Sequence, residues 1–152
     1  RIGDVIGPES TWVKNPLKLL KLRLLFLINH SEGILNYIDI RDLVDLIEIL
    51  LDSNINNTIY NVSSGEYTIF NDYFRDLAIQ KRLPAPLSLP KKMVKFLIRT
   101  QELFCRIFNM RTESTLHTLN YISCARHISI GKVKAMTHWI PKIPYKTLLN
   151  GI

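Results

Sequence analysis

The chain has 152 residues, which is the length of one ordinary domain. Hydrophobic residues make up 47% and charged residues 22%, a balance that excludes a disordered tail or a low-complexity linker. The longest apolar run, 17–28, contains Lys18, Lys21 and Arg23 and falls short of the roughly 20 apolar residues that a membrane-spanning helix needs.

The formal net charge of +7 is unevenly distributed. Residues 1–80 contain seven basic and eleven acidic side chains, a balance of −4, whereas residues 81–152 contain thirteen basic and two acidic ones, a balance of +11. An excess of this kind can mark an anionic partner such as nucleic acid or lipid. Its ordinary explanation is the solvated outer face of a helix.

Cysteine and histidine give no pattern that would hold a metal ion. Cys105 and Cys124 do not form a C-x-x-C pair. No two histidines lie four residues apart, the spacing that places two imidazoles on one helix face; they are His30, His117, His127 and His138. We therefore predict no metal site, and two unpaired thiols favour the reducing environment of the cytoplasm.

The first third of the chain predicts strands and one helix. Residues 1–6 form a short apolar strand ended by Gly-Pro, and Thr11 is the expected cap of a helix over 12–22. The apolar runs 23–28 and 34–38 flank a loop rich in turn formers, which favours a β-hairpin.

The middle of the chain alternates helix and strand. The pattern predicts a helix over 42–52 with Asp42 as its N-cap, because that carboxylate can accept from a free N–H of the first turn. A β-rich run over 58–62 follows, and then an amphipathic helix over 68–81 that Thr68 would cap. This alternation indicates an α/β protein.

The last third is predicted to be helical. Apolar residues recur at three-to-four spacing over 91–108. Shorter helices are expected over 113–121, after Ser129 and over 145–150. There is no internal repeat.

Four segments, in order, resemble the C-terminal half of an extended short-chain dehydrogenase/reductase, a member of the NAD-dependent epimerase/dehydratase superfamily. Residues 1–8 are similar to the family's R-x-x-x-x-Y-G-P strand, and 37–43 to its V-x-V-x-D-h run. Residues 59–65 resemble its h-Y-N-h-G-x-G turn, and 130–141 its D-x-x-K-A-x-x-x-L-G-W-x-P ending.

The resemblance implies the C-terminal part of a Rossmann-like NAD(P)-binding fold with a small, mostly helical substrate-binding subdomain. Residues 1–152 would be the substrate-binding portion, and NAD or NADP would be held by an N-terminal half that this chain lacks. In this family a Tyr-x-x-x-Lys pair performs the chemistry and a G-x-x-G-x-x-G loop holds the pyrophosphate. Neither motif occurs here, so we expect no catalytic residue and no activity from the chain alone.

The same resemblance implies site residues on the first strand. Gly3 and Val5 would approach the cofactor. Asp4 would contact the substrate, because it stands where nucleotide-sugar enzymes often have an asparagine. Trp139 and Pro141 would fix the C-terminal segment to the core, and Asn61 with Gly65 would shape a turn.

One departure from the family suggests the kind of small-molecule substrate. Leu35 occupies the position where nucleotide-sugar enzymes usually have an arginine that binds a substrate phosphate. With Leu89 and Met93 in an apolar second half, this resembles the 3β-hydroxysteroid dehydrogenase and dihydroflavonol reductase branch, whose substrates are apolar alcohols or ketones. The alternative is that all of this apolar material belongs to the core.

Two other classes of function stay open. The cationic amphipathic stretches 14–28 and 91–111 suit a membrane-surface or protein-interaction domain without catalysis, with peripheral membrane contact. Nucleic-acid binding ranks last and is not predicted, because the basic residues alternate with apolar ones and form no known reading motif.

Overall fold

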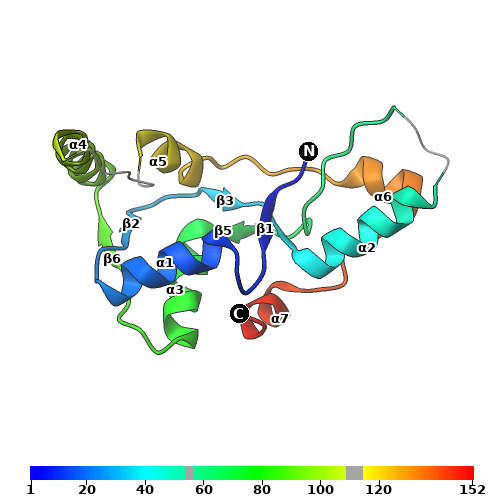
Figure 1. Cartoon of the computed structure of the whole chain (residues 1–152), viewed down its shortest axis with the longest axis horizontal. Coiled ribbons are helices and arrows are strands. Elements are labelled where there is room, and N and C mark those ends of the chain that lie inside the picture. Colours follow the sequence, from blue (N-terminus) through cyan, green and yellow to red (C-terminus); the bar gives the residue numbers. More distant parts are fainter. Residues whose placement is uncertain (54–56, 109–114) are drawn as a thin grey trace. The chain divides into compact units, whose positions relative to one another are not determined.

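The computed structural model describes residues 1–53, 57–108 and 115–152 (Figure 1). The chain forms two compact units, and each is assembled from segments that are distant in the sequence. The first unit comprises residues 1–18, 35–68 and 127–152, and the second comprises 19–34 and 69–126. The elements are β1 (Asp4–Ile6), α1 (Thr11–Lys21), β2 (Phe26–Ile28), β3 (Ile34–Leu35), β4 (Tyr37–Asp39), α2 (Ile40–Leu51), β5 (Thr68–Ile69), α3 (Phe70–Gln80), β6 (Leu87–Leu89), α4 (Lys91–Ile107), α5 (Leu116–Ile122), α6 (Gly131–Thr137) and α7 (Tyr145–Asn150).

The first unit is built on a parallel strand pair. β1 pairs with β4 in a register that places Ile6 beside Asp39. Beyond the start of β1, the backbone N–H of Gly3 donates to the carbonyl oxygen of Val62 over 2.8 Å, and Ile2 forms a parallel bridge with the same residue. The strand predicted over 58–62 is therefore reduced to one bridge in the described structure.

One apolar cluster forms the centre of the first unit, and we call it the first-unit core. Figure 1 shows α6 beside α2, and both helices contribute to this cluster. Its buried members are Ile38, Leu43, Leu46, Tyr60, Val62, Ile130, Val133 and Trp139. The prediction that Trp139 fixes the C-terminal segment is confirmed, because its side chain is only 3% exposed. Gly65 shapes its turn with a φ of 76°, a left-handed conformation that suits glycine.

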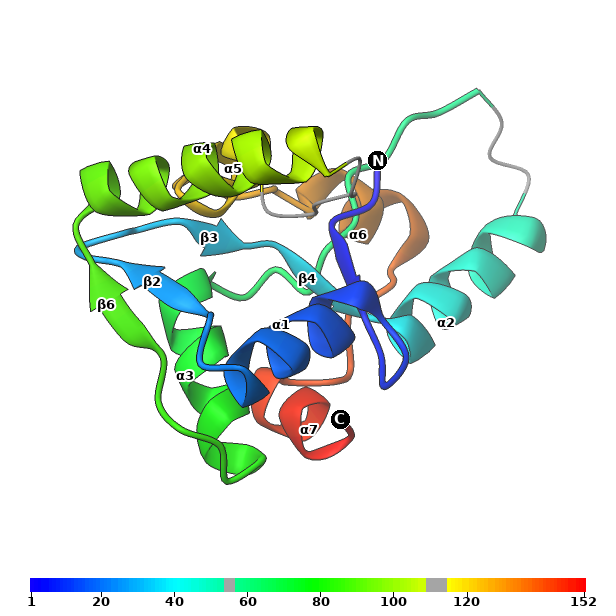
Figure 2. The ribbon, with the colours of Figure 1, turned by 60° about the vertical axis from the view of Figure 1, so that its left-hand side comes forward.

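The second unit contains a second parallel pair, β2 with β6, in which Phe26 lies beside Leu87. Figure 2 shows α4 running beside α5 in this unit. The two helices and the strand pair share a cluster that we call the second-unit core. Its buried members are Ile28, Val94 and Leu119, with Phe26, Leu89, Ile98, Leu116 and Ile122 packed against them.

The β-hairpin predicted from 23–28 and 34–38 is wrong. β2 pairs with β6, and β4 pairs with β1, each in parallel. β3 pairs with β5 instead. The loop between the two runs contains the turn formers that favour a hairpin, but parallel partners lie far along the chain and leave no local signal.

Two predicted helix caps are also wrong. α2 begins at Ile40, and its N-cap is Asp39, whose carboxylate accepts from the backbone N–H of Arg41 over 2.8 Å. Asp42 therefore lies inside the first turn. α3 begins at Phe70 and has Ile69 at its N-cap without a side-chain hydrogen bond, so Thr68 lies in β5 and does not cap it.

The other predicted helices lie close to their expected positions. α1, α4 and α6 begin within one or two residues of the predicted starts, and α7 matches its prediction. The cap predicted at Thr11 is wrong by one residue, because Thr11 is already the first residue of α1. α5 begins at Leu116, while the start of the helix predicted over 113–121 lies outside the described residues. In the described part of the chain, no helix has the length and apolarity to cross a membrane.

Candidate functional site

The candidate site lies in the first unit, at the carboxyl ends of β1 and β4 and the start of α2. In open α/β folds, ligands bind outside the carboxyl ends of parallel strands. Here these ends place the Gly7-Pro8 turn after β1 next to Asp39 at the end of β4. The side chains around this edge show what the site can do.

The three residues predicted to approach cofactor and substrate lie in β1 and immediately before it. A Cβ at Gly3 would collide with the backbone carbonyl oxygen of Asn36, so glycine is needed there for two backbones to approach. Asp4 is 7% exposed, and its backbone N–H donates to the Asn36 carbonyl oxygen over 2.8 Å. Val5 is partly buried against the first-unit core.

Asn36 is a structural residue that the sequence did not reveal. Its side chain is buried, and the side-chain oxygen accepts from the backbone N–H of Ile128 over 2.7 Å. Its backbone carbonyl accepts from Asp4, so this one residue joins β1 to the segment that leads into α6. Asparagine is common in loops, and nothing local identifies a partner 92 residues away.

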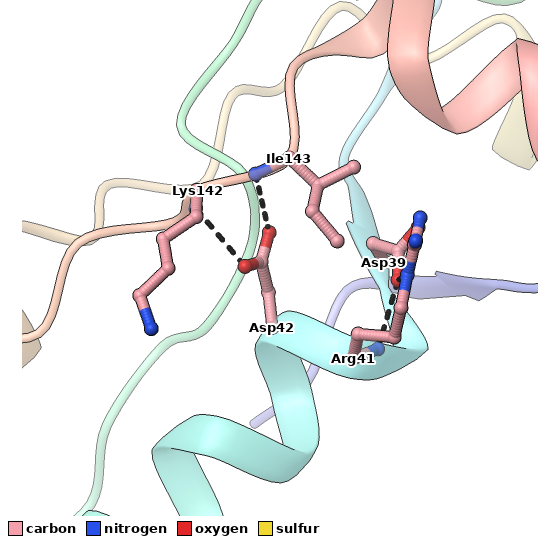
Figure 3. Close-up of polar contacts among 5 residues, drawn as sticks. All are labelled: Asp39, Arg41, Asp42, Lys142 and Ile143. Carbon is pink, nitrogen blue, oxygen red and sulfur yellow. Dashed lines mark hydrogen bonds and ion pairs between the residues drawn. The ribbon is translucent and has the colours of Figure 1, made fainter.

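Asp39 and Arg41 form a fork at the start of α2 (Figure 3). Nε and Nη2 of Arg41 each donate to one carboxylate oxygen of Asp39 over 2.9 Å. Burial would raise the pKa of Asp39, but the hydrogen bonds and charge of Arg41 outweigh it and lower that pKa below its ordinary value. The carboxylate is ionised and fully engaged, which makes it a cap rather than a proton donor.

Asp42 holds the segment that precedes α7. Its side chain is 2% exposed, and its two carboxylate oxygens accept from the backbone N–H groups of Lys142 and Ile143 over 3.0 and 3.1 Å (Figure 3). The ammonium group of Lys142 also donates to Asp45 over 2.7 Å, which raises the pKa of that lysine. Asp42 thus has a structural role, although not the capping role predicted for it.

A second polar group joins β4 to α7. The hydroxyl of the buried Tyr37 donates to the Glu66 carboxylate, which also accepts from the backbone N–H of Tyr145 over 3.1 Å. Burial, followed by the hydrogen bond to Glu66, raises the pKa of Tyr37 well above its ordinary value. A tyrosine that acts as an acid/base needs the opposite shift, so Tyr37 is a structural residue.

The predicted substrate residues divide between the two units. Leu35 belongs to the first unit and is 0% exposed, which makes it core. Leu89 belongs to the second unit and packs against the second-unit core, whereas Met93 in α4 is half-exposed.

The second unit also contains a mostly apolar pocket of about 120 Å³. Its lining residues are Leu20, Arg23, Leu25, Pro84, Ala85, Pro86 and Leu87. Arg23 is the one charged residue of that lining. Among the described residues, no three histidine, cysteine or acidic side chains gather as a metal site would require.

Many solved structures share this fold over nearly the whole chain, among them the three that follow, although no family model and no curated protein matches the sequence. RMD from Pseudomonas aeruginosa, complexed with NADPH, is 16% identical with a TM-score of 0.63, over 100% of this chain and 45% of its own. The enzyme WbmG from Bordetella bronchiseptica, in complex with NAD, is 15% identical with a TM-score of 0.65, over 99% and 40%. UDP-glucose 4-epimerase from Thermotoga maritima, with UDP-glucose, is 17% identical with a TM-score of 0.64, over 98% and 42%.

These likenesses establish the fold. The chain has part of the α/β, Rossmann-like fold of NAD-dependent epimerase/dehydratase-type enzymes, as the sequence predicted. It spans less than half the length of these three structures.

Proposed function

We propose that the chain is the C-terminal, substrate-binding portion of an NAD(P)-dependent oxidoreductase or epimerase. The observation that carries this proposal is the match of 98–100% of the chain to 40–45% of three proteins whose structures were solved with NADPH, NAD or UDP-glucose. The four ordered motifs support it. NAD or NADP would be bound by the portion of the enzyme that carries the glycine-rich loop and the catalytic tyrosine and lysine.

The site geometry agrees with a supporting role. Asp39 and Asp42 are saturated by Arg41 and by backbone N–H groups, and Tyr37 is held protonated. These groups shape the edge where β1 and β4 end and leave the proton transfer to residues supplied by the other portion.

The substrate we propose is an apolar alcohol or ketone. The buried Leu35 offers neither charge nor space to a pyrophosphate at the position where nucleotide-sugar enzymes use arginine. In the second unit, the pocket lining is almost wholly apolar, and Met93 of α4 exposes 51% of its surface. Apolar surface of this kind favours an uncharged ligand over a nucleotide sugar.

Fluorescence titration of the 152-residue chain with NADH and NADPH tests the half-enzyme role. We expect no saturable binding, because the chain has no glycine-rich loop to hold the pyrophosphate. Tight capture of either dinucleotide would contradict that role.

A separate titration tests the substrate class. NMR chemical shifts should respond to a steroid ketone such as progesterone and not to UDP-glucose. Met93→Glu should weaken the response, whereas Leu51→Glu, at a 78% exposed position on α2, should leave it unchanged. Binding of UDP-glucose alone would contradict the apolar substrate while leaving the half-enzyme role intact.

A further inference from the structure

α4 is apolar on two sides, and the described residues cover only one of them. Val94 and Ile98 face the second-unit core. A second set of apolar residues consists of Phe96 and the residues seven, eight and eleven positions after it, and this spacing places them on one helix face. This set, which we call the outer stripe, comprises Phe96, Leu103, Phe104 and Ile107, and its members are 60–68% exposed.

Four cations lie along one edge of the outer stripe. At helical spacing, they lie between the stripe and the remaining polar face of α4; they are Lys92, Lys95, Arg99 and Arg106. Within the described parts of the chain, none of the four forms an ion pair. The one acid of α4, Glu102, accepts from the backbone N–H of Leu116 at the start of α5 over 3.2 Å, so it is engaged away from these cations.

We propose that α4 binds an anionic lipid surface, lying in the plane of the membrane. The outer stripe would enter the boundary between headgroups and acyl chains, and the four cations would contact anionic headgroups. The charge pattern selects this occupant, because lipid supplies an apolar layer and a negative layer side by side. With 17 residues, six of them charged, α4 lies on a bilayer rather than across it.

Co-sedimentation of the 152-residue chain with vesicles tests this proposal. We expect binding to vesicles of equal parts phosphatidylserine and phosphatidylcholine, little binding to phosphatidylcholine alone, and loss of binding as salt rises to about 0.5 M. The double variant F96E/F104E should bind at least about tenfold more weakly, because two aromatic side chains no longer enter the bilayer.

Two further variants separate the apolar and electrostatic parts. R99E should weaken binding to the anionic vesicles by about fivefold or more without affecting phosphatidylcholine. Ile79→Glu serves as the matched control, because this α3 residue in the same unit is apolar and 75% exposed but lies off the stripe. It should bind like the parent chain, and circular dichroism should show that all variants keep their helices.

Three outcomes of the vesicle experiment would overturn the proposal. They are no binding to anionic vesicles, binding that F96E/F104E leaves unchanged, and an equal loss in the Ile79→Glu control. A lipid-free dimer in sedimentation velocity that F96E/F104E abolishes would also overturn it, because the stripe would then bind a second copy of the chain.

Discussion

Ile143 donates its backbone N–H to a carboxylate oxygen of Asp42, 101 residues earlier in the chain, over 3.1 Å. The second oxygen accepts from Lys142, so one buried side chain fixes the segment between α6 and α7 to the start of α2. This carboxylate joins the middle and last segments of the first unit, 35–68 and 127–152.

Asp42→Ala should lower the free energy of unfolding by about 2–4 kcal/mol, because it leaves the backbone N–H groups of Lys142 and Ile143 without their carboxylate acceptor. Asp42→Asn keeps one acceptor and should lose less. Urea denaturation followed by circular dichroism measures both. Asp45→Ala removes only the exposed pair with Lys142 and should change stability by less than about 1 kcal/mol. Equal losses at the two positions would contradict the role of Asp42.

Asp39 should make the protein sensitive to acid. Its pKa in the folded chain lies below the ordinary value of about 3.9, so its contribution to stability is complete above about pH 5. As the pH falls through the folded pKa, the carboxylate is protonated and the contribution is lost. Asp39→Asn should flatten the fall in urea midpoint below about pH 4. It should cost no more than about 1 kcal/mol at neutral pH, because the amide oxygen can still cap α2 but no longer forms the charged pair with Arg41. A variant as acid-sensitive as the parent would refute this assignment.

Tyr37 should have the opposite effect at high pH. Because its pKa is raised in the folded state, the unfolded chain releases the phenolic proton first, and stability should fall as the pH rises above about 10. Tyr37→Phe should remove that part of the alkaline loss and lower stability near neutral pH by about 1 kcal/mol. Tyr67→Phe, at a 74% exposed tyrosine, provides the comparison and should behave like the parent.

Gly3→Ala should destabilise the first unit by more than about 2 kcal/mol, because the new methyl group would meet the Asn36 backbone, which cannot move like the end of a flexible side chain. Gly131→Ala is the matched control. Its Cβ would meet nothing closer than 3.6 Å, and alanine favours the helix that begins there. Thermal unfolding distinguishes the two, and a neutral Gly3→Ala would show that the close approach is unnecessary.

The sequence predicted where the helices lie, but it did not predict which strands pair with each other. The apolar spacing in 91–108 predicts α4 because helical periodicity is local. β1 and β4 are only three residues each, and their parallel pairing joins residues 33 positions apart, so no short-range pattern records it.

The sequence predicted which segments form the candidate site, but not which side chains contact each other there. The motif around 37–43 located the start of α2, but choosing between Asp39 and Asp42 as its cap required the first helical residue, which sequence patterns place only within a few positions. The Glu66 carboxylate meets Tyr37 and Tyr145 across 29 and 79 residues. Such meetings depend on the completed fold.

The two units alternate along the sequence, and this affects any attempt to express one of them separately. The backbone passes from one unit to the other at 18–19, 34–35, 68–69 and 126–127, so no single cut releases either unit as an intact piece. Any truncation removes material from a fold that its remaining segments need. Expressing one continuous stretch of the gene would yield an incomplete unit. Only a design that reorders or joins the separate segments could isolate one complete unit.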